Sequence, residues 1–304
     1  MKKKILIIGY GSIGKKHHRI LKKFKDISEI KVLSNHCNLN FILKKKLSKL
    51  LDYNPDYILI CTETHKHFSD LKLIDRIYRK KIVLVEKPIF HKNLNYNFKN
   101  NTYFVGYNLR FHPVIKYIKS IVDRKKEFFF SARLDCSSYL PSWRKNIDYL
   151  KSYSSNRYKG GGVLLDLSHE LDYLQYIFGP ITKIDYARIK KISNLNTTSE
   201  DTSDLLGEIN DINFSIHLSY FSRLQKREIF LNGNNCSILG NLINNTIEII
   251  DKRKKVKKII FSNNKDQTYI DQHINILSNK IINACSINEG KKIISLVDLI
   301  KKIF

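Results

Sequence analysis

The sequence predicts an α/β protein in which a parallel sheet is followed by an α+β domain with a mostly antiparallel, open sheet. Short apolar runs alternate with helical patterns up to about residue 110, as expected for parallel strands joined by helices. A glycine-rich turn follows the first of these runs. Beyond residue 110, strand patterns follow one another through short turns, which favours antiparallel pairing. We therefore predict two domains, 1–110 and 111–304.

The length and composition are typical of a globular protein. The chain has 304 residues, of which 42% are hydrophobic, so two domains can each bury a core. No apolar run approaches the roughly 18–20 residues that cross a bilayer, which predicts no membrane partner. The apolar run after the N-terminal lysines is too short for a signal peptide and ends in glycine, so we expect a cytoplasmic location. The cysteines are scattered, which predicts free thiols and no metal site: Cys37, Cys61, Cys136, Cys236 and Cys285.

The formal net charge of +26 raises nucleic-acid binding as an alternative function, because neutralising phosphates drives such binding. However, lysine greatly outnumbers arginine and is spread over the whole length. This pattern indicates a general compositional bias, and we predict no nucleic-acid partner. The same positive field would attract small anionic substrates.

A dinucleotide-binding fingerprint lies near the N-terminus. Residues 4–8 form a predicted strand, and a helical pattern covers residues 15–25. The glycine motif between them has the strand–turn–helix context that this fingerprint requires. Its first glycine permits a tight turn, the second lets a pyrophosphate approach the backbone, and the third lets helix and strand pack closely, with the helix N-terminus facing the phosphates. The predicted cofactor-binding residues are Gly9, Gly11, Ser12, Ile13 and Gly14.

The end of the second predicted strand, residues 29–33, bears on cofactor choice. An acidic residue there would bind the adenosine ribose of NAD, but the sequence has Ser34, Asn35 and His36. Small polar groups suit a 2′-phosphate better than a carboxylate does. The sequence therefore favours NADP over NAD, with Ser34 and Asn35 as contacts, although no arginine accompanies them.

Two further predicted strands end at the same sheet edge. The strand 57–61 leads into the loop from Thr62 to His67, where Thr62 is a candidate cofactor contact and His67 either touches the cofactor or caps the next helix. The strand 82–85 stops at Glu86, Lys87 and Pro88. Proline forces the chain out of the sheet, so Glu86 and Lys87 stand at the carboxyl edge where open α/β sheets bind ligands. The alternative is a solvated strand end.

One helix dominates the second half. After Gly160–Gly162, an apolar stripe of leucines and Phe178 at spacings of three and four predicts a single amphipathic helix. Asp166 and His169 fall on the opposite face as neighbours. An ordinary solvated face is the alternative, but three preceding glycines favour close approach of a backbone or a ligand. Strands are predicted at 127–134, 181–192, 205–209, 212–221, 228–231 and onward to 260, and C-terminal helices at 268–284 and 290–303.

These motifs together resemble the glucose-fructose oxidoreductase / inositol dehydrogenase / MocA (Gfo/Idh/MocA) family. The resemblance covers nearly the whole chain and is carried by the glycine fingerprint, Thr62 to His67, Glu86-Lys87-Pro88, Gly106 to Pro113, and the run from Gly160 to Asp172. It implies an NAD(P)-binding Rossmann domain, then a substrate domain whose open sheet often forms the contact of a homo-oligomer, a dimer or tetramer. It also implies a cis Lys87–Pro88 peptide. In many members the aspartate and histidine of the last motif are four residues apart, whereas here they are three apart.

The resemblance implies hydride transfer between NAD(P) and a hydroxyl carbon of a sugar or nucleotide-sugar. Lys87 and His169 would flank the nicotinamide, supported by Asp166, although Asp172 is an alternative support. The sequence of residues 106–113, 140–144 and 148–149 resembles that of a subgroup linked to bacterial surface-sugar biosynthesis. A non-catalytic nucleotide-binding regulator or scaffold of the same fold is the alternative function.

The candidate substrate wall combines aromatic and polar side chains. Trp143 could stack on a sugar face or belong to the core, and Arg144 could bind a carboxylate or a nucleotide diphosphate. The full set of candidates is Tyr107, Asn108, Arg110, Trp143, Arg144 and Tyr149.

Overall fold

The structure is a computed structural model that describes residues 2–34, 42–43, 52–124, 127–143, 148–262, 264–278 and 281–303. The chain forms two units. The first comprises Met1–Asn108 and Tyr269–Ser295, and the second comprises Leu109–Thr268 and Leu296–Phe304. The first break lies near the predicted boundary, but the return of 269–295 to the first unit differs from the predicted continuous second domain.

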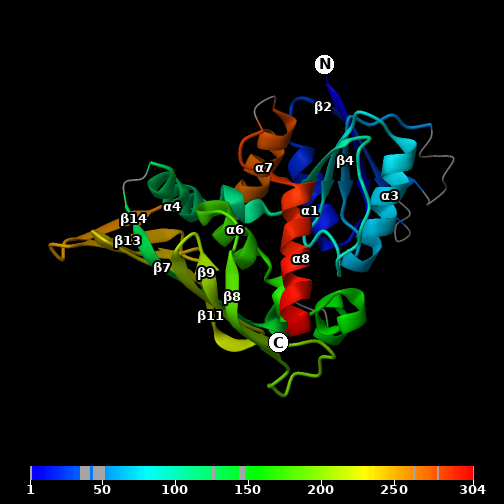
Figure 1. Cartoon of the computed structure of the whole chain (residues 1–304). Coiled ribbons are helices and arrows are strands. Elements are labelled where there is room, and N and C mark those ends of the chain that lie inside the picture. The colour runs from blue at the N-terminus through cyan, green and yellow to red at the C-terminus, as the bar shows by residue number, and fades with distance from the viewer. Residues whose placement is uncertain are drawn as a thin grey trace. The chain divides into compact units, whose positions relative to one another are not determined.

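The first unit contains a seven-stranded sheet in the order β15-β6-β5-β4-β1-β2-β3, drawn largely in blue to cyan in Figure 1. All its pairings are parallel except that of β15 with β6. The strands are β1 (Lys3–Ile8), β2 (Ile27–Leu33), β3 (Ile42–Leu43), β4 (Tyr57–Ile60), β5 (Ile82–Val85), β6 (Thr102–Val105) and β15 (Cys285–Ser286). The predicted Rossmann sheet is confirmed.

The position of β1 defines the ligand-binding edge of this sheet. The chain adds β2 and β3 on one side of β1, and β4 to β6 on the other. Ligands bind at such a reversal of strand order, outside the carboxyl ends of the strands. Buried side chains on both faces of β1 and β4, such as Ile5, Leu6 and Tyr57, explain why these strands read as continuous apolar runs.

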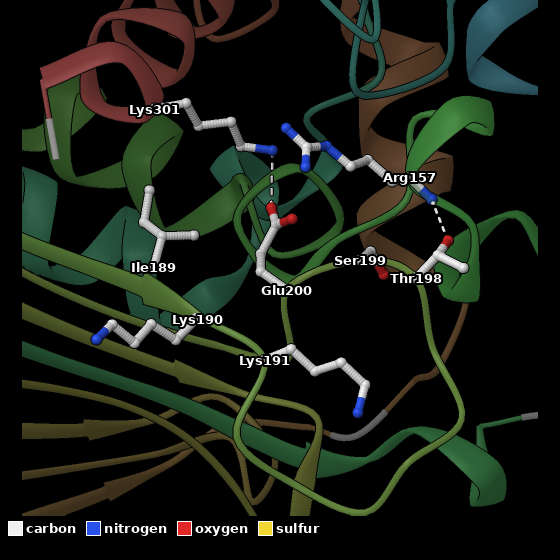
Figure 2. A pocket seen from close by; sticks show the side chains of 8 residues that line it. All are labelled: Arg157, Ile189, Lys190, Lys191, Thr198, Ser199, Glu200 and Lys301. Atoms are coloured by element: carbon white, nitrogen blue, oxygen red, sulfur yellow. Dashed lines mark hydrogen bonds and ion pairs between the residues drawn. The ribbon is translucent and has the colours of Figure 1, made fainter.

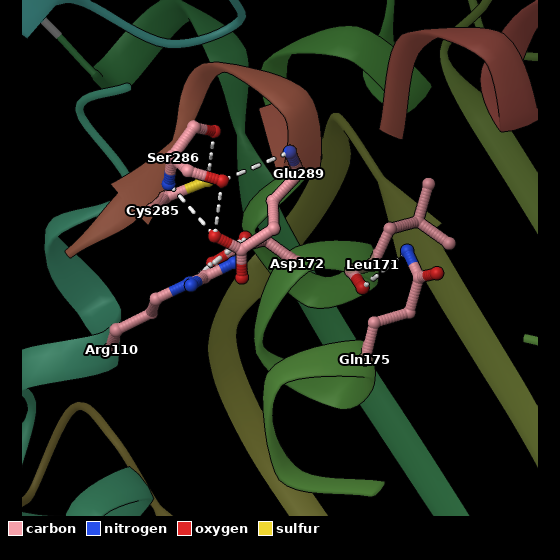
Figure 3. A network of polar contacts seen from close by, with 7 residues as sticks. All are labelled: Arg110, Leu171, Asp172, Gln175, Cys285, Ser286 and Glu289. Atoms are coloured by element: carbon pink, nitrogen blue, oxygen red, sulfur yellow. Dashed lines mark hydrogen bonds and ion pairs between the residues drawn. The ribbon is translucent and has the colours of Figure 1, made fainter. Parts of the chain in front are cut away.

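Among the described residues, the α-helices that belong wholly or partly to the first unit are α1 (Ser12–Leu21), α3 (His67–Ile77), α7 (Gln267–Leu277) and α8 (Ile287–Ile303). The helix α7 ends at Leu277 rather than at the predicted residue 284. Ser286 and Glu289 form a capping box at the start of α8: the Glu289 backbone N–H donates to the Ser286 hydroxyl at 3.3 Å, and the Ser286 backbone N–H donates to Glu289 Oε2 at 2.8 Å (Figure 3). This local signal ends β15 and starts α8 within two residues.

The second unit contains an eight-stranded sheet in the order β14-β13-β12-β11-β7-β10-β9-β8. Only β7 and β10 pair in parallel, so the predicted mostly antiparallel sheet is confirmed. The strands are β7 (Phe129–Tyr139), β8 (Lys183–Lys190), β9 (Thr202–Ile209), β10 (Ile212–Ser219), β11 (Phe221–Gly233), β12 (Cys236–Asn241), β13 (Thr246–Asp251) and β14 (Val256–Ile260).

The helix α4 (Pro113–Asp123) has no counterpart in the sequence prediction. Pro113 occupies its first turn, where a missing N–H costs nothing. His112 is the N-cap, and its Nδ1 accepts a hydrogen bond from the Val114 N–H at 3.3 Å. Short one-turn 3-10 helices lie at 140–142, 149–151, 153–155 and 157–159.

The predicted single helix after the three glycines is wrong. It is broken into α5 (Val163–Asp166) and α6 (His169–Phe178), with Leu167 at φ −98° and ψ 26° between them. The alternative of a solvated face is also wrong, because Asp166, His169 and Tyr173 are all buried. Asp166 and His169 therefore stand at the end of one helix and the start of the next.

Within the described part of the chain, no helix is both long and apolar enough to cross a membrane. The cysteines that the structure describes, Cys61, Cys136, Cys236 and Cys285, are free thiols as predicted. Cys37 lies outside the described residues.

Candidate functional site

The glycine turn between β1 and α1 is tightly packed at two of its glycines and open at the third. Gly9 has φ +92°, and a Cβ there would lie 2.7 Å from the Cys61 carbonyl oxygen. A Cβ on Gly14 would lie 2.2 Å from the Gly9 carbonyl oxygen, so these two positions require glycine. By contrast, nothing lies within 4 Å of a Cβ built on Gly11.

The first turn of α1 offers backbone donors to an anion. Gly11 is its N-cap and provides no side-chain cap, and no acidic residue occupies the first turn. Uncapped N–H groups and the positive end of the helix dipole favour a phosphate. Together with the open space at Gly11, the turn and the backbone at Ser12 and Ile13 fit the pyrophosphate of NAD(P).

Of the residues predicted to bind the cofactor ribose, the structure describes only Ser34. This residue follows β2 directly and is buried. Asn35 and His36 lie outside the described residues. Thr62 follows β4, and its hydroxyl donates to Asp70 Oδ2 of α3 at 2.7 Å. This contact holds the loop against the start of that helix.

The His67 side chain bridges the loop after β4 and the loop after β5 by hydrogen bonds. Its Nδ1 lies 3.0 Å from the Pro88 carbonyl oxygen, and its Nε2 lies 3.0 Å from the Thr62 carbonyl oxygen. Burial lowers the pKa of the imidazole, so the ring is neutral at pH 7. It provides no cap for α3, whose N-cap is Lys66, so the capping alternative is wrong.

Lys87 follows β5 and is held on both sides along the chain. Before it, Glu86 donates its backbone N–H to Ile60 at 2.9 Å, and its Oε1 lies 2.8 Å from Nε2 of His17. After it, the Lys87–Pro88 peptide is cis, as the family resemblance implies, and the Pro88 carbonyl contacts His67. The half-buried Lys87 is thus presented from a fixed backbone at the ligand-binding edge.

In the second unit, Asp166 is held by a residue that the sequence did not suggest. The Tyr220 hydroxyl donates to Asp166 Oδ2 at 2.7 Å. Burial and the nearby Asp166 carboxylate raise the pKa of Tyr220 well above its ordinary value, which keeps the phenol protonated as a donor. Tyr220 lies in no recognisable motif, so only the tertiary structure identifies it.

Trp143 packs edge-on against Tyr220. The ring centroids are 5.2 Å apart and the ring planes meet at 88°. Its Nε1 donates to the Ser138 hydroxyl at 2.9 Å, and 37% of the residue is exposed. The core alternative for Trp143 is therefore wrong, and an aromatic face stands next to the tyrosine that holds Asp166.

Two ion pairs anchor α6. Arg110 donates to both carboxylate oxygens of Asp172 at 2.7–3.1 Å, and both side chains are buried (Figure 3). Arg227 likewise contacts both oxygens of the fully buried Glu170, at 2.7 and 3.0 Å. The structure thus places Arg110 in a buried ion pair, which differs from its predicted place on a substrate wall. Asp172, the alternative support for His169, has both of its carboxylate oxygens hydrogen-bonded to Arg110.

The remaining wall candidates have different environments. Tyr107 is fully buried and Asn108 is 5% exposed. Tyr149 is half-buried, and its hydroxyl accepts a hydrogen bond from the Asn196 backbone N–H at 3.1 Å. Arg144 lies outside the described residues.

A pocket of about 290 Å³ lies within the second unit (Figure 2). Its single carboxylate, Glu200, is paired with Lys301 at 2.7 Å. Arg157 and Lys190 form no ion pair with any residue that the structure describes, so positive charge is in excess and the pocket can hold an anion. The lining residues are Arg157, Ile189, Lys190, Lys191, Thr198, Ser199, Glu200 and Lys301.

Among the described residues, no group of three or more histidine, cysteine, aspartate or glutamate side chains could hold a metal ion.

Family models match both parts of the chain. The oxidoreductase family's NAD-binding Rossmann fold matches residues 3–96, and its C-terminal alpha/beta domain matches residues 135–302. The chain belongs to the Gfo/Idh/MocA oxidoreductase family. Its first unit is accordingly an NAD(P)-binding Rossmann fold.

One relative matches part of the chain by sequence. The uncharacterized oxidoreductase YrbE of Bacillus subtilis (strain 168) is 32% identical over 200 residues, which are 60% of this chain and 55% of YrbE. The match thus spans about half of that relative's length.

Solved structures resemble the whole chain. UDP-N-acetylglucosamine 3-dehydrogenase GnnA from Acidithiobacillus ferrooxidans is 16% identical, with a TM-score of 0.77 and coverage of 99% of this chain and 97% of GnnA. Levoglucosan dehydrogenase in complex with NADH is 15% identical, with a TM-score of 0.82 and coverage of 99% and 96%. At these identities the similarity shows the fold.

Proposed function

We propose that this protein transfers a hydride between NAD(P) and a hydroxyl carbon of a sugar or nucleotide-linked sugar. The observation that carries the proposal is the fixed presentation of Lys87. The cationic side chain follows a strand at the ligand-binding edge, and Glu86 and Pro88 on either side of it are held by buried histidines.

Each residue has a role that its chemistry suits. His169 accepts the hydroxyl proton as the general base in the oxidation direction. Lys87 stabilises the substrate oxygen as it gains negative charge. Asp166, itself held by Tyr220, orients His169. The bound nicotinamide supplies the hydride chemistry.

Substitution of the two central residues tests this assignment. Lys87→Ala and His169→Ala should each lower turnover by roughly 10²–10⁴, the range for a positioned acid or base, with cofactor affinity nearly unchanged. Asp166→Asn should cause a smaller loss, because it disturbs only the orientation of the histidine. Lys99→Ala, at an exposed lysine of the same unit, is the matched control.

Steady-state rates with a panel of sugars, measured beside melting temperature, decide the outcome. A well-folded Lys87→Ala or His169→Ala variant within threefold of wild type would remove that residue's role. Cofactor binding without turnover on any sugar or nucleotide-sugar would instead favour a non-catalytic regulator.

The cofactor preference follows from the missing carboxylate at Ser34, Asn35 and His36. NADP(H) should bind at least as tightly as NAD(H), and Asn35→Asp should shift the preference toward NAD. Titration by nicotinamide fluorescence measures both affinities. A wild-type preference for NAD of more than tenfold would contradict this part of the proposal.

The cationic pocket of the second unit favours a substrate with a phosphate or diphosphate group, as in a nucleotide-linked sugar. Pyrophosphate should bind at physiological salt, and Arg157→Gln combined with Lys190→Gln should weaken it at least tenfold. Lys257→Gln, at an exposed lysine of β14, is the control for general charge. Equal weakening by the control would show that the binding reflects net charge only.

We expect a homo-oligomer, with the open face of the eight-stranded sheet as the contact between copies. Light scattering after size-exclusion chromatography measures the mass in solution. A monomer at micromolar concentration would contradict this expectation.

A further inference from the structure

Four buried side chains of the first unit form a continuous row of hydrogen bonds. Glu86 Oε1 lies 2.8 Å from His17 Nε2, His17 Nδ1 lies 2.9 Å from His273 Nε2, and His273 Nδ1 lies 3.0 Å from the Tyr57 hydroxyl. His17, His273 and Tyr57 are 0% exposed, and Glu86 is 7% exposed. The row joins the cofactor helix α1, α7, β4 and the residue immediately before Lys87.

The chemistry of its two ends gives the row a direction. A carboxylate only accepts, so His17 donates from Nε2 to Glu86 and its Nδ1 is left to accept. His273 then donates from Nε2 to His17, and its own Nδ1 accepts from the Tyr57 hydroxyl. In this arrangement each imidazole carries a proton on Nε2 and accepts at Nδ1, and every ring nitrogen in the row has a partner.

Burial lowers the pKa of His273 well below its ordinary value, which agrees with a neutral ring at that position. Burial also raises the pKa of Tyr57 well above its ordinary value. Passing a proton from Tyr57 along the row to Glu86 would leave a buried phenolate, which is costly. The row is therefore suited to holding groups in place and unsuited to conducting protons.

The Glu86 carboxylate is confined by its neighbours. A Cβ on Gly106 would lie 2.7 Å from Glu86 Oε1. The backbone directly after β6 therefore packs closely against the Glu86 carboxylate. Its backbone N–H is bonded to Ile60. The carboxylate is thus confined by β6 on one side and by His17 on another, directly beside Lys87 in the chain.

We propose that His17 and His273 are positioning residues that, through the Glu86 carboxylate, hold the backbone presenting Lys87 in its reactive place. This rests on the role proposed above for Lys87. His17 lies three residues after Gly14 on the cofactor helix, so one side chain ties the cofactor-binding turn to the segment that carries Lys87.

Matched variants at His17 separate positioning from packing. In His17→Gln the amide N–H can still donate to Glu86, whereas His17→Met fills a similar volume without a donor. His17→Met should lower kcat by roughly tenfold to hundredfold, as expected when a reacting group is slightly misplaced, with NAD(P)H affinity within threefold of wild type. His17→Gln should retain kcat within threefold. Equal kcat in both variants, when both are folded, would overturn the proposal.

NMR tests the row without relying on turnover. Long-range ¹H–¹⁵N spectra should show a proton on Nε2 of both His17 and His273, and a ring at either position without an Nε2 proton would overturn the proposal. The backbone amide resonance of Lys87 should shift or broaden in His17→Met and match wild type in His17→Gln. An unchanged Lys87 resonance in a folded His17→Met protein would also refute positioning, even if no sugar in the panel were turned over.

His273 provides a second pair of variants in case His17→Met does not fold. His273→Gln keeps a donor toward His17, and His273→Met removes it. Being one step farther from Glu86, His273→Met should give a smaller loss of kcat and a smaller shift of the Lys87 resonance. A folded His273→Met protein that equals His273→Gln in both measurements would remove His273 from the proposal.

Discussion

Removing Asp172 tests whether Arg110 serves the fold or a substrate. Arg110 is 4% exposed and Asp172 is 1% exposed, so Asp172→Ala leaves a guanidinium buried without its counter-charge. Breaking a buried pair in this way typically costs about 3–5 kcal/mol. Arg110 also lies over the Tyr176 ring at 4.9 Å, but a cation–π contact of about 1–2 kcal/mol cannot replace the carboxylate.

Urea unfolding followed by tryptophan fluorescence measures this loss. Trp143 is the chain's one tryptophan and belongs to the second unit, as do Arg110 and Asp172, so the signal reports the unit that is perturbed. Replacing both partners, as Arg110→Met with Asp172→Leu, should recover most of the stability because no buried charge is left unpaired.

The control is Asp123→Ala, which breaks the surface pair of Lys119 and Asp123 on α4. Since such exposed pairs contribute about 0.5 kcal/mol, its free energy of unfolding should hardly change. A loss below 1 kcal/mol for Asp172→Ala, or a double variant as unstable as the sum of its singles, would refute the reasoning. A substrate role predicts a different result, in which Arg110→Met raises KM without loss of stability.

Other predictions concern pH, the glycine turn and charge. Burial lowers the pKa of His112 to about 4, below its unfolded value of about 6.5. The unfolded chain therefore binds the proton first as pH falls, and stability should drop by roughly 3 kcal/mol from pH 6.5 to 4. His112→Asn keeps a capping side chain but should flatten this slope in urea titrations; parallel slopes would contradict the assignment. Gly14→Ala should lose folding because its Cβ meets the Gly9 carbonyl, whereas Gly11→Ala should keep its melting temperature and lose NAD(P)H affinity. Double-stranded DNA should bind weakly, without sequence preference, and less as salt rises; tight selective binding at physiological salt would contradict this.

The sequence alone determined the architecture of both sheets and the cofactor-binding turn. Apolar periodicity and the Gly9–Gly14 spacing are local signals, and the clash that excludes a Cβ at Gly14 comes from the nearby Gly9 carbonyl. The clash at Gly9, by contrast, comes from the distant Cys61. The end of β5 at Pro88 was predictable because proline acts on its own backbone.

Only the tertiary structure decided how the polar residues are used. His17 and His273 are 256 positions apart, and Arg110 and Asp172 are 62 apart, distances over which no periodicity carries information. The helical wheel joined Asp166 and His169 on one helix because leucine spacing continues through Leu167, although the backbone breaks there. Whether a buried polar group faces a substrate or a partner in the fold depends on which distant element supplies its hydrogen bond, and that is settled by packing.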